Sequence, residues 1–282
     1  MAHYWLYFLL GAWCFPALSC DPAKDASRIA VAGGSITEIL YFLGEESRII
    51  ATDSTSTYPA GARLFPSIGY VRGLSAEGIL SLKPSLILGE HDMGPEIVIK
   101  QIENVSVDIR RIPEAHTTKG ITDKIFCVAS VLGKSEEART LVSESLGHKL
   151  ELLKNAVDRS SINGKFVIIL SIRDGSPIVA GRRTSGDGLL RMVGAANIFS
   201  DIDGWKPVSL ESIAASNPDF IVVAGRSNDP GRTIEIVKQN AAIKITEAAK
   251  RNQILVIDGM ALLGFGPRTL NIGLDLISLA SD

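Results

Sequence analysis

Short apolar runs alternate with amphipathic segments along most of the 282-residue chain. In the first half, the apolar runs at 28–32, 48–51 and 85–89 are typical of short buried strands. Between them, the spacing of apolar residues predicts helices over 36–43 and from Ser75, a residue type that caps helix starts. Strands that alternate with helices in this way predict a parallel sheet with helices on its faces.

The second half repeats this layout. A strand is predicted at 165–170 and a helix at 187–193, and the run 209–225 is a helix, an Asn-Pro break and a strand. The run 209–225 aligns with 75–89 with only two residues of slack. Internal similarity of this kind indicates two related lobes.

A strongly helical stretch at 120–157 separates the two halves. Gly133 interrupts it and Ser135 can cap its continuation, so we expect a short helix, a turn and a long connector. A helical connector predicts a stiff hinge and small lobe closure. The predicted fold is therefore α/β, with two Rossmann-like lobes of mainly parallel sheet joined by a long interlobe α-helix. The predicted units are a signal peptide at 1–19, an N-terminal lobe at 26–118, connecting helices at 119–160 and a C-terminal lobe at 161–282.

The N-terminus is typical of an export signal. Residues 6–18 are almost wholly apolar but too few to span a bilayer comfortably, and Ala17 and Ser19 suit cleavage before Cys20. No lysine or arginine precedes the apolar run, so a buried N-terminal helix is the alternative.

Cleavage before Cys20 leaves two cysteines in the chain. The run 17–20 is loosely similar to a lipoprotein box, which makes a lipid anchor at Cys20 a second alternative. Cys127 lies among apolar residues on a helical pattern, so we expect a buried free thiol and no disulfide framework.

Charge and the absence of common motifs argue against nucleic-acid binding and against several classes of enzyme. The net charge is −2 and no basic stripe stands out, which argues against a nucleic-acid partner. Gly33-Gly34 lacks the spacing of a phosphate loop, and we interpret it as a tight strand-to-helix turn. No Ser-His-Asp arrangement, CxxC pair or HExxH helix is visible, so an enzyme on a doubly wound scaffold is a distant alternative.

Ligands of open α/β lobes gather at the carboxyl ends of the strands. Four segments of the chain are predicted to reach such ends: 33–35, 70–72, 90–93, and 171–173 together with 182–185.

Tyr70 and Arg72 form the most informative of these candidate sites. In an extended segment, residues two apart point to the same side, so the phenol and the guanidinium face one ligand together. A neighbouring cation favours the phenolate, and a phenolate can be an axial ligand to ferric haem iron. The alternative is a half-buried tyrosine beside a surface arginine.

The run SIGYVRGLSAEGILSLKPSLILG, at 67–89, resembles the haem-binding periplasmic proteins of bacterial ABC haem importers. These belong to the helix-linked two-lobe binding proteins, together with vitamin B12-binding and siderophore-binding proteins. The resemblance continues in VAGGSITEILYFLG, AGRRTSGDGLLRMVGAAN and LLGFGPRT. It implies a periplasmic, non-enzymatic carrier that binds haem as its transported ligand, with Tyr70 on the iron, and delivers it to a permease and its ATPase subunit. We expect a monomer; a siderophore or a corrinoid is the alternative ligand.

Further site residues follow from the same resemblance. Arg72 is expected to bind the Tyr70 oxygen or a haem propionate, because arginine suits bidentate carboxylate binding. On the second lobe, Arg182 and Thr184 match a loop of the family, whereas Arg183 departs from it. Further candidates for carboxylate contacts are Arg173, Arg226 and Arg268; the alternative for each arginine is a solvated surface position.

Some members of the family have a second-lobe histidine that faces the tyrosine. This chain has no histidine in its second lobe; those beyond the signal are His91, His116 and His148. His91 follows a strand end, and His116 lies in a polar turn. We therefore expect five-coordinate ferric haem on Tyr70, and the missing histidine argues against a two-haem site.

Glu77 and Glu211 occupy equivalent places in the two repeats, Ser-Ala-Glu and Ser-Leu-Glu. In the related vitamin B12 and siderophore proteins, one surface glutamate per lobe docks into arginine pockets of the permease, and the resemblance gives that role to these two residues. The alternative is that each simply favours its helix dipole from the first turn.

Overall fold

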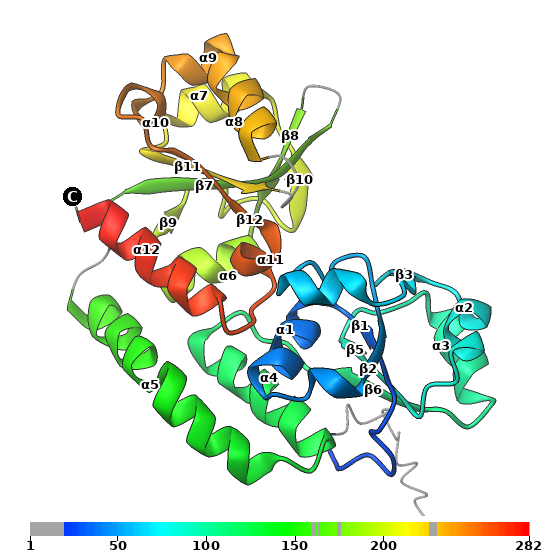
Figure 1. Cartoon of the computed structure of the whole chain (residues 1–282). Helices are drawn as coiled ribbons and strands as arrows, with labels where there is room; N and C mark the ends of the chain where they lie inside the picture. Colours follow the sequence, from blue (N-terminus) through cyan, green and yellow to red (C-terminus); the bar gives the residue numbers. More distant parts are fainter. Residues whose placement is uncertain (1–19, 160–161, 163, 174–175, 226–229, 282) are drawn as a thin grey trace, which may run out of the picture.

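The computed structural model describes residues 20–159, 162, 164–173, 176–225 and 230–281. The predicted signal peptide at 1–19 lies outside the described residues. Figure 1 shows two α/β lobes, with a pair of helices running along both of them. The predicted two-lobe α/β class is confirmed.

The N-terminal lobe is built on a four-stranded parallel sheet in the order β2-β1-β5-β6. Its strands are β1 (Ile29–Ala32), β2 (Ile49–Thr52), β5 (Leu86–Glu90) and β6 (Asp108–Ile112). Alternate residues of β1 point to opposite faces: Ile29 belongs to the apolar cluster under α1 (Gly34–Phe42), and Ala30 to the one under α2 (Ala76–Ser81) and α3 (Glu96–Glu103). Both faces are therefore buried, which explains the continuously apolar strands.

Short elements complete this lobe. They are the 3₁₀ helices η1 (Glu46–Arg48) and η2 (Ala60–Leu64) and a two-stranded hairpin of β3 (Gly69–Tyr70) and β4 (Gly73–Leu74).

The C-terminal lobe has a six-stranded mixed sheet in the order β10-β8-β7-β11-β12, with β9 paired to β7. Its strands are β7 (Lys165–Arg173), β8 (Ser176–Ala180), β9 (Ala196–Asn197), β10 (Trp205–Pro207), β11 (Phe220–Gly225) and β12 (Ile254–Asp258). β7, β11 and β12 are parallel, as expected, whereas β8 pairs antiparallel with both of its neighbours, β7 and β10. Arg173 of β7 pairs with Ser176 of β8, and strands joined by so few residues pair antiparallel.

Helices cover both faces of this second sheet. One face carries α6 (Ser185–Met192), α11 (Gly259–Leu263) and α12 (Thr269–Ser281). The other carries α7 (Leu210–Ser216), α8 (Pro230–Gln239), α9 (Ala241–Lys244) and α10 (Glu247–Lys250).

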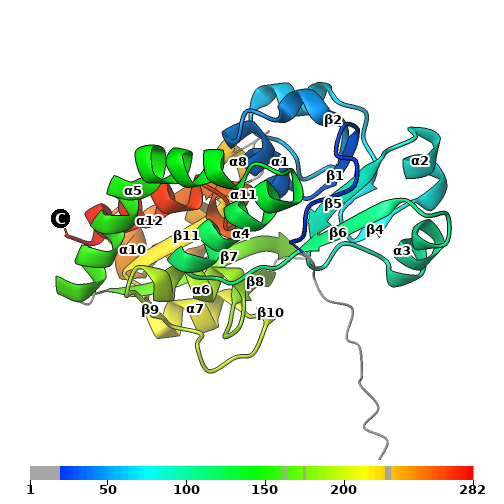
Figure 2. The same ribbon diagram turned by 90° about the horizontal axis from the view of Figure 1, so that it is seen from below.

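The connector consists of α4 (Thr118–Val131) and α5 (Ser135–Arg159). The Thr117 hydroxyl caps α4, and Gly133, with φ +71°, makes the turn between the helices. α5 lies alongside α12 in both views (Figures 1 and 2). One apolar cluster runs from the first sheet through the connector to the second, which favours the stiff hinge expected from the sequence.

Cys20 and Cys127 form a disulfide, with their Cα atoms 4.9 Å apart. The expectation of a free buried thiol at Cys127 was therefore wrong, because the polar stretch after Cys20 folds back onto α4. The backbone N–H of Ala23 donates to the Val131 carbonyl at 2.9 Å and holds it there. A lipid thioether would use the same Cys20 sulfur, so the anchor and the disulfide exclude each other in one molecule.

Within the part of the chain that the structure describes, none of the helices has the length and apolar character needed to cross a membrane.

Candidate functional site

Tyr70 and Arg72 lie on the β3–β4 hairpin and share its exposed side. Val71, between them, is buried in the apolar cluster under α2 and α3, so the two side chains share one side as predicted. The expected extended segment was wrong, however, because Val71 and Arg72 form the turn between β3 and β4. Tyr70 leaves 46% of its surface exposed. In Figure 1, β3 lies on the side of the N-terminal lobe that faces the C-terminal lobe.

Arg72 links Tyr70 to an aspartate, Asp92, that sequence reasoning did not single out. Arg72 Nη1 donates to Tyr70 Oη at 2.5 Å, and Arg72 Nε donates to Asp92 Oδ2 at 2.7 Å. Arg72 Nη2 donates to the same Asp92 oxygen. Partial burial lowers the pKa of Arg72, but the hydrogen bond and charge of Asp92 outweigh it and raise that pKa overall. We call Tyr70, Arg72 and Asp92 the tyrosine cluster.

Backbone hydrogen bonds fix the two segments that carry the tyrosine cluster. Asp92 lies in the turn after β5, and the N–H of Gly94 in that turn donates to the Val71 carbonyl at 2.9 Å. The Leu74 N–H donates back to the Gly94 carbonyl at 2.8 Å. Met93 is buried beside Val71 and Leu74. These hydrogen bonds hold the hairpin and the turn after β5 in a fixed relative position, so the residues of the tyrosine cluster lie on one backbone frame.

A second group of polar residues is buried where the lobes meet, and we call it the interlobe cluster: Ser35, Glu90, Glu114 and Lys124. Lys124 Nζ donates to Ser35 Oγ at 3.2 Å, to the Gly264 carbonyl of the second lobe at 3.0 Å, and to Glu114. Ser35 Oγ donates to Glu90 Oε1 at 2.7 Å. The sequence placed Ser35 and Glu90 in segments at strand ends, but it gave no signal for Glu114 or Lys124 because these lie far from both in the chain.

Burial and neighbouring charges shift the pKa values of the two carboxyl groups of the interlobe cluster in opposite directions. Burial raises the pKa of Glu90 to about 7, against the opposing charge of Lys124. Burial also acts to raise the pKa of Glu114, but hydrogen bonds from His116 and Lys124 and the charge of Lys124 lower it to about 2.

Arg268, a sequence candidate for a ligand carboxylate, joins the two lobes instead. Its backbone N–H and its Nε each donate to the Glu38 carboxylate at 2.7 Å. Its Nη1 lies 3.3 Å from Asp258 Oδ1, and its guanidinium stacks 3.8 Å from the centroid of the Tyr58 ring. Burial raises the pKa of Glu38 more than Arg268 lowers it.

The remaining described second-lobe candidates lie at the end of β7 and in the segment between β8 and α6. Arg173 and Arg182 are exposed, and Arg183 pairs with Asp203. Thr184 is buried: its hydroxyl donates to the Gly181 carbonyl and accepts from an amide of the first turn of α6. A ligand contact through this hydroxyl stays a prediction that would require the cap to open. Arg226 lies outside the described residues.

The histidines occupy different environments. His91 and His148 are exposed. His116 pairs with Glu114 at 2.9 Å, and its ring lies 4.8 Å from that of Phe265 in the second lobe. His116 is therefore part of the contact between lobes.

Glu77 and Glu211 are exposed in the first turns of α2 and α7. Ser75 and Ser209 cap these helices, each accepting from the amide three residues on. The two turns are equivalent, as the repeat predicts, and both glutamates also suit the positive ends of their helices.

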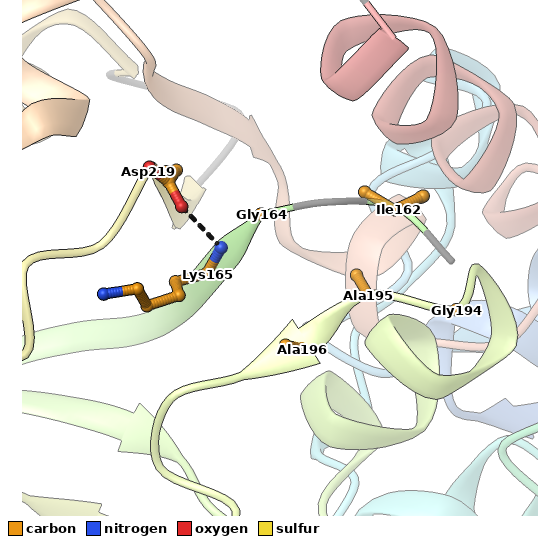
Figure 3. Close-up of a pocket in the computed structure, with 7 residues that line it drawn as sticks. All are labelled: Ile162, Gly164, Lys165, Gly194, Ala195, Ala196 and Asp219. Atoms are coloured by element: carbon orange, nitrogen blue, oxygen red, sulfur yellow. Dashed lines mark hydrogen bonds between the residues drawn. The ribbon is translucent and has the colours of Figure 1, made fainter. Parts of the chain in front are cut away.

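A shallow pocket lies away from all of these residues (Figure 3). Gly164, Lys165, Ala196 and Asp219 line it at the amino ends of β7 and β11, with Lys165 N–H donating to Asp219 at 2.8 Å. Ligands of open α/β sheets bind at the opposite, carboxyl edge, so this pocket carries no assignment.

Comparison with known proteins gives one family. The family model described as periplasmic binding protein matches residues 29–261. The periplasmic heme-binding protein RhuT from Roseiflexus sp. RS-1 superposes with a TM-score of 0.82 at 28% identity, over 91% of this chain and 98% of that one. A periplasmic heme binding protein from Pseudomonas aeruginosa gives 0.80 at 31%, over 90% and 92%. A vitamin B12-binding protein of Pectobacterium atrosepticum is 25% identical over 78% of this chain and 80% of that one.

Proposed function

Because the chain belongs to the periplasmic binding protein family, we propose that it is the substrate-binding component of an ABC importer and that its substrate is haem. It binds and delivers the substrate and catalyses no reaction. The tyrosine cluster is the observation that carries the proposal, since it presents an exposed phenol to a cationic hydrogen-bond donor.

The proposed chemistry is ligation of ferric haem iron by the Tyr70 oxygen. A phenolate is a known axial ligand of ferric haem, and a cation beside it favours the ionised form. Arg72 Nη1 is already 2.5 Å from that oxygen, so the stabilising donor is in place before the iron arrives. Among the described residues, no group of three or more His, Cys, Asp and Glu side chains is placed to hold a metal ion. In this proposal the porphyrin supplies the other iron ligands.

Exposed arginines on the second lobe are suited to bind the propionate groups of haem. Haem carries two propionates, and the guanidinium fork matches a carboxylate. Arg173 and Arg182 are exposed and form the proposed carboxylate contacts on the second lobe. Arg268 is left out of this proposed set, because its Nε and Nη1 already pair with Glu38 and Asp258.

Two features support the delivery step. The relatives named above include two periplasmic heme-binding proteins and a vitamin B12-binding protein. Exposed Glu77 and Glu211 lie in equivalent first turns, one per lobe, and we assign them to contacts with the permease. The protein would then act outside the cytoplasm, after export directed by 1–19.

A corrinoid is the second candidate substrate, favoured by the vitamin B12-binding relative. Titration of a protein comprising residues 20–282 with hemin, cyanocobalamin and a ferric siderophore separates the candidates. We expect a hemin complex with a phenolate-to-iron charge-transfer band in the red part of the visible spectrum and no saturable binding of the other two. Tight binding of cyanocobalamin or the siderophore, with hemin inert, would overturn the proposal.

A further inference from the structure

The guanidinium of Arg72 is divided between two partners. Its Nε and Nη2 edge donates to Asp92 Oδ2, and the remaining nitrogen, Nη1, donates to the Tyr70 oxygen. A guanidinium is planar and rigid, so the carboxylate on one edge sets the direction in which the opposite nitrogen points. We propose that Asp92 is a positioning residue that aims Arg72 at Tyr70 and so tunes haem ligation; this rests on the proposed role of Tyr70 as iron ligand.

Stability gives no adequate reason for a carboxylate at this position. Arg72 has 57% of its side chain exposed, and ion pairs this exposed contribute little to folding. The second oxygen of Asp92, Oδ1, is shielded from solvent and has no hydrogen-bond partner among the described residues. A shielded acceptor without a partner is unfavourable. The contact with Arg72 therefore accounts for a carboxylate at this position, despite the cost of the unpartnered Oδ1.

The backbone supplies the precision that positioning requires. Asp92 and Arg72 are 20 residues apart, yet reciprocal hydrogen bonds of the Gly94 backbone with the Val71 carbonyl and the Leu74 N–H join their segments. Both residues therefore stand on one frame, while the long Arg72 side chain is free to rotate unless something holds it. Asp92 holds it through two donors, Nε and Nη2, whereas Tyr70 accepts from Nη1 alone.

Asp92 has two opposing effects on Tyr70. Its negative charge partly offsets the cation that favours a phenolate, whereas its hydrogen bonds keep that cation in place. In an exposed site, water weakens the electrostatic effect of the Asp92 charge on Tyr70. The hydrogen bond from Arg72 Nη1 to Tyr70, in contrast, is lost when the guanidinium rotates and the donor no longer points at the oxygen. The positioning effect therefore dominates, and removing the carboxylate weakens haem binding.

A mutant cycle tests the proposal through hemin dissociation constants and the charge-transfer band. We expect Asp92→Ala to weaken hemin binding about tenfold and to shift the band, and Asp92→Asn, which keeps an acceptor, to stay within about threefold of wild type. Adding Asp92→Ala to Arg72→Ala should cause no further loss of hemin affinity, because the hydrogen bonds that position Arg72 are already absent. The matched control is Asp108→Ala, which breaks the Arg110 pair on β6 and should leave hemin binding unchanged. Unchanged or tighter binding by Asp92→Ala, or equal losses in both backgrounds, would overturn the proposal.

A second readout needs no haem. NMR of the Arg72 guanidinium in the unliganded protein should show slow rotation in the wild type and fast rotation in Asp92→Ala. Equally slow rotation in the variant would contradict the positioning role. If the wild type fails to bind hemin while this NMR difference is present, the proposed substrate is wrong and the positioning of Arg72 by Asp92 still holds.

Discussion

The tyrosine cluster and the interlobe cluster each contain a cation paired with a carboxylate, but they differ in exposure and in the number of partners. The Arg72 side chain is 57% exposed, whereas that of Lys124 is 1% exposed and donates to three segments of the chain. A buried cation with every donor used holds elements together. An exposed pair that leaves a phenol oxygen accessible is suited to a ligand. Burial therefore separates a structural polar cluster from a binding one.

The largest effect is expected when the buried cation is removed. Lys124→Ala leaves Glu114 buried without its lysine, and breaking such a pair lowers the free energy of unfolding by about 3–5 kcal/mol. Urea denaturation measures this. The matched control is Lys119→Ala in the same helix, whose pair with Asp123 is solvent-exposed and contributes no more than about 0.5 kcal/mol. Equal losses in the two variants would remove the contrast between the clusters.

The pH dependence of stability tests the interlobe cluster a second way. Because the folded pKa of Glu90 is about 7, above its ordinary value, the folded state binds more protons than the unfolded state between pH 4.5 and 7. The contribution of Glu90 is fully present at low pH and is lost as pH rises through 7, by on the order of 3 kcal/mol.

Glu90→Gln should flatten the decline in the free energy of unfolding between pH 5 and 8. Glu114 does not interfere in that range, because its pKa is about 2 and its stabilisation is lost only as pH falls below its ordinary value. A decline of the same size in Glu90→Gln would assign the titration to another group.

Glu77 and Glu211, which we propose contact the permease, test whether exposed acidic residues outside the tyrosine cluster serve transport. Changing Glu77 and Glu211 together to Ala should weaken stimulation of the transporter ATPase in reconstituted membranes about tenfold, roughly 1–2 kcal/mol. Hemin titration should be unaltered. Glu136, an exposed first-turn glutamate of α5, provides the control substitution. Weaker hemin binding with normal ATPase stimulation would place the two carboxylates at the ligand instead.

The smallest effect is expected for the histidines. His91→Ala and His116→Ala should each leave the ferric haem spectrum nearly unchanged, because His91 is solvent-exposed and His116 is engaged with Glu114 and Phe265. Loss of a low-spin signal in either variant would show a six-coordinate site. His116→Ala should still lower the free energy of unfolding by about 1 kcal/mol through the lost hydrogen bond.

Local signals in the sequence predicted much of the fold. The strand and helix positions follow from apolar periodicity and capping residues, and Tyr70 and Arg72 were found from the short run around them, although a hairpin turn and not an extended segment puts them on one side. Each of these depends on neighbours within a few residues.

What the sequence missed depends on contacts between distant residues. Cys20 and Cys127 are 107 residues apart, and Lys124 bonds to groups 89 and 140 residues away. Asp92 was not recognised as a site residue, although its neighbour His91 was considered. Its partner Arg72 is 20 residues away in the chain, and no local pattern indicates that the two pair. Periodicity gives the faces of elements but not which polar groups meet when the lobes pack.

Removal of a single oxygen tests the central claim most directly. Tyr70→Phe keeps the ring but deletes the proposed iron ligand, and Tyr58→Phe is the matched control, since Tyr58 is 45% exposed and Tyr70 46%. The account predicts that hemin complexes of the wild type and Tyr58→Phe share a phenolate charge-transfer band and phenolate modes in resonance Raman spectra. Tyr70→Phe should lack both and bind hemin at least about a hundredfold more weakly. An unchanged spectrum in Tyr70→Phe would contradict the account.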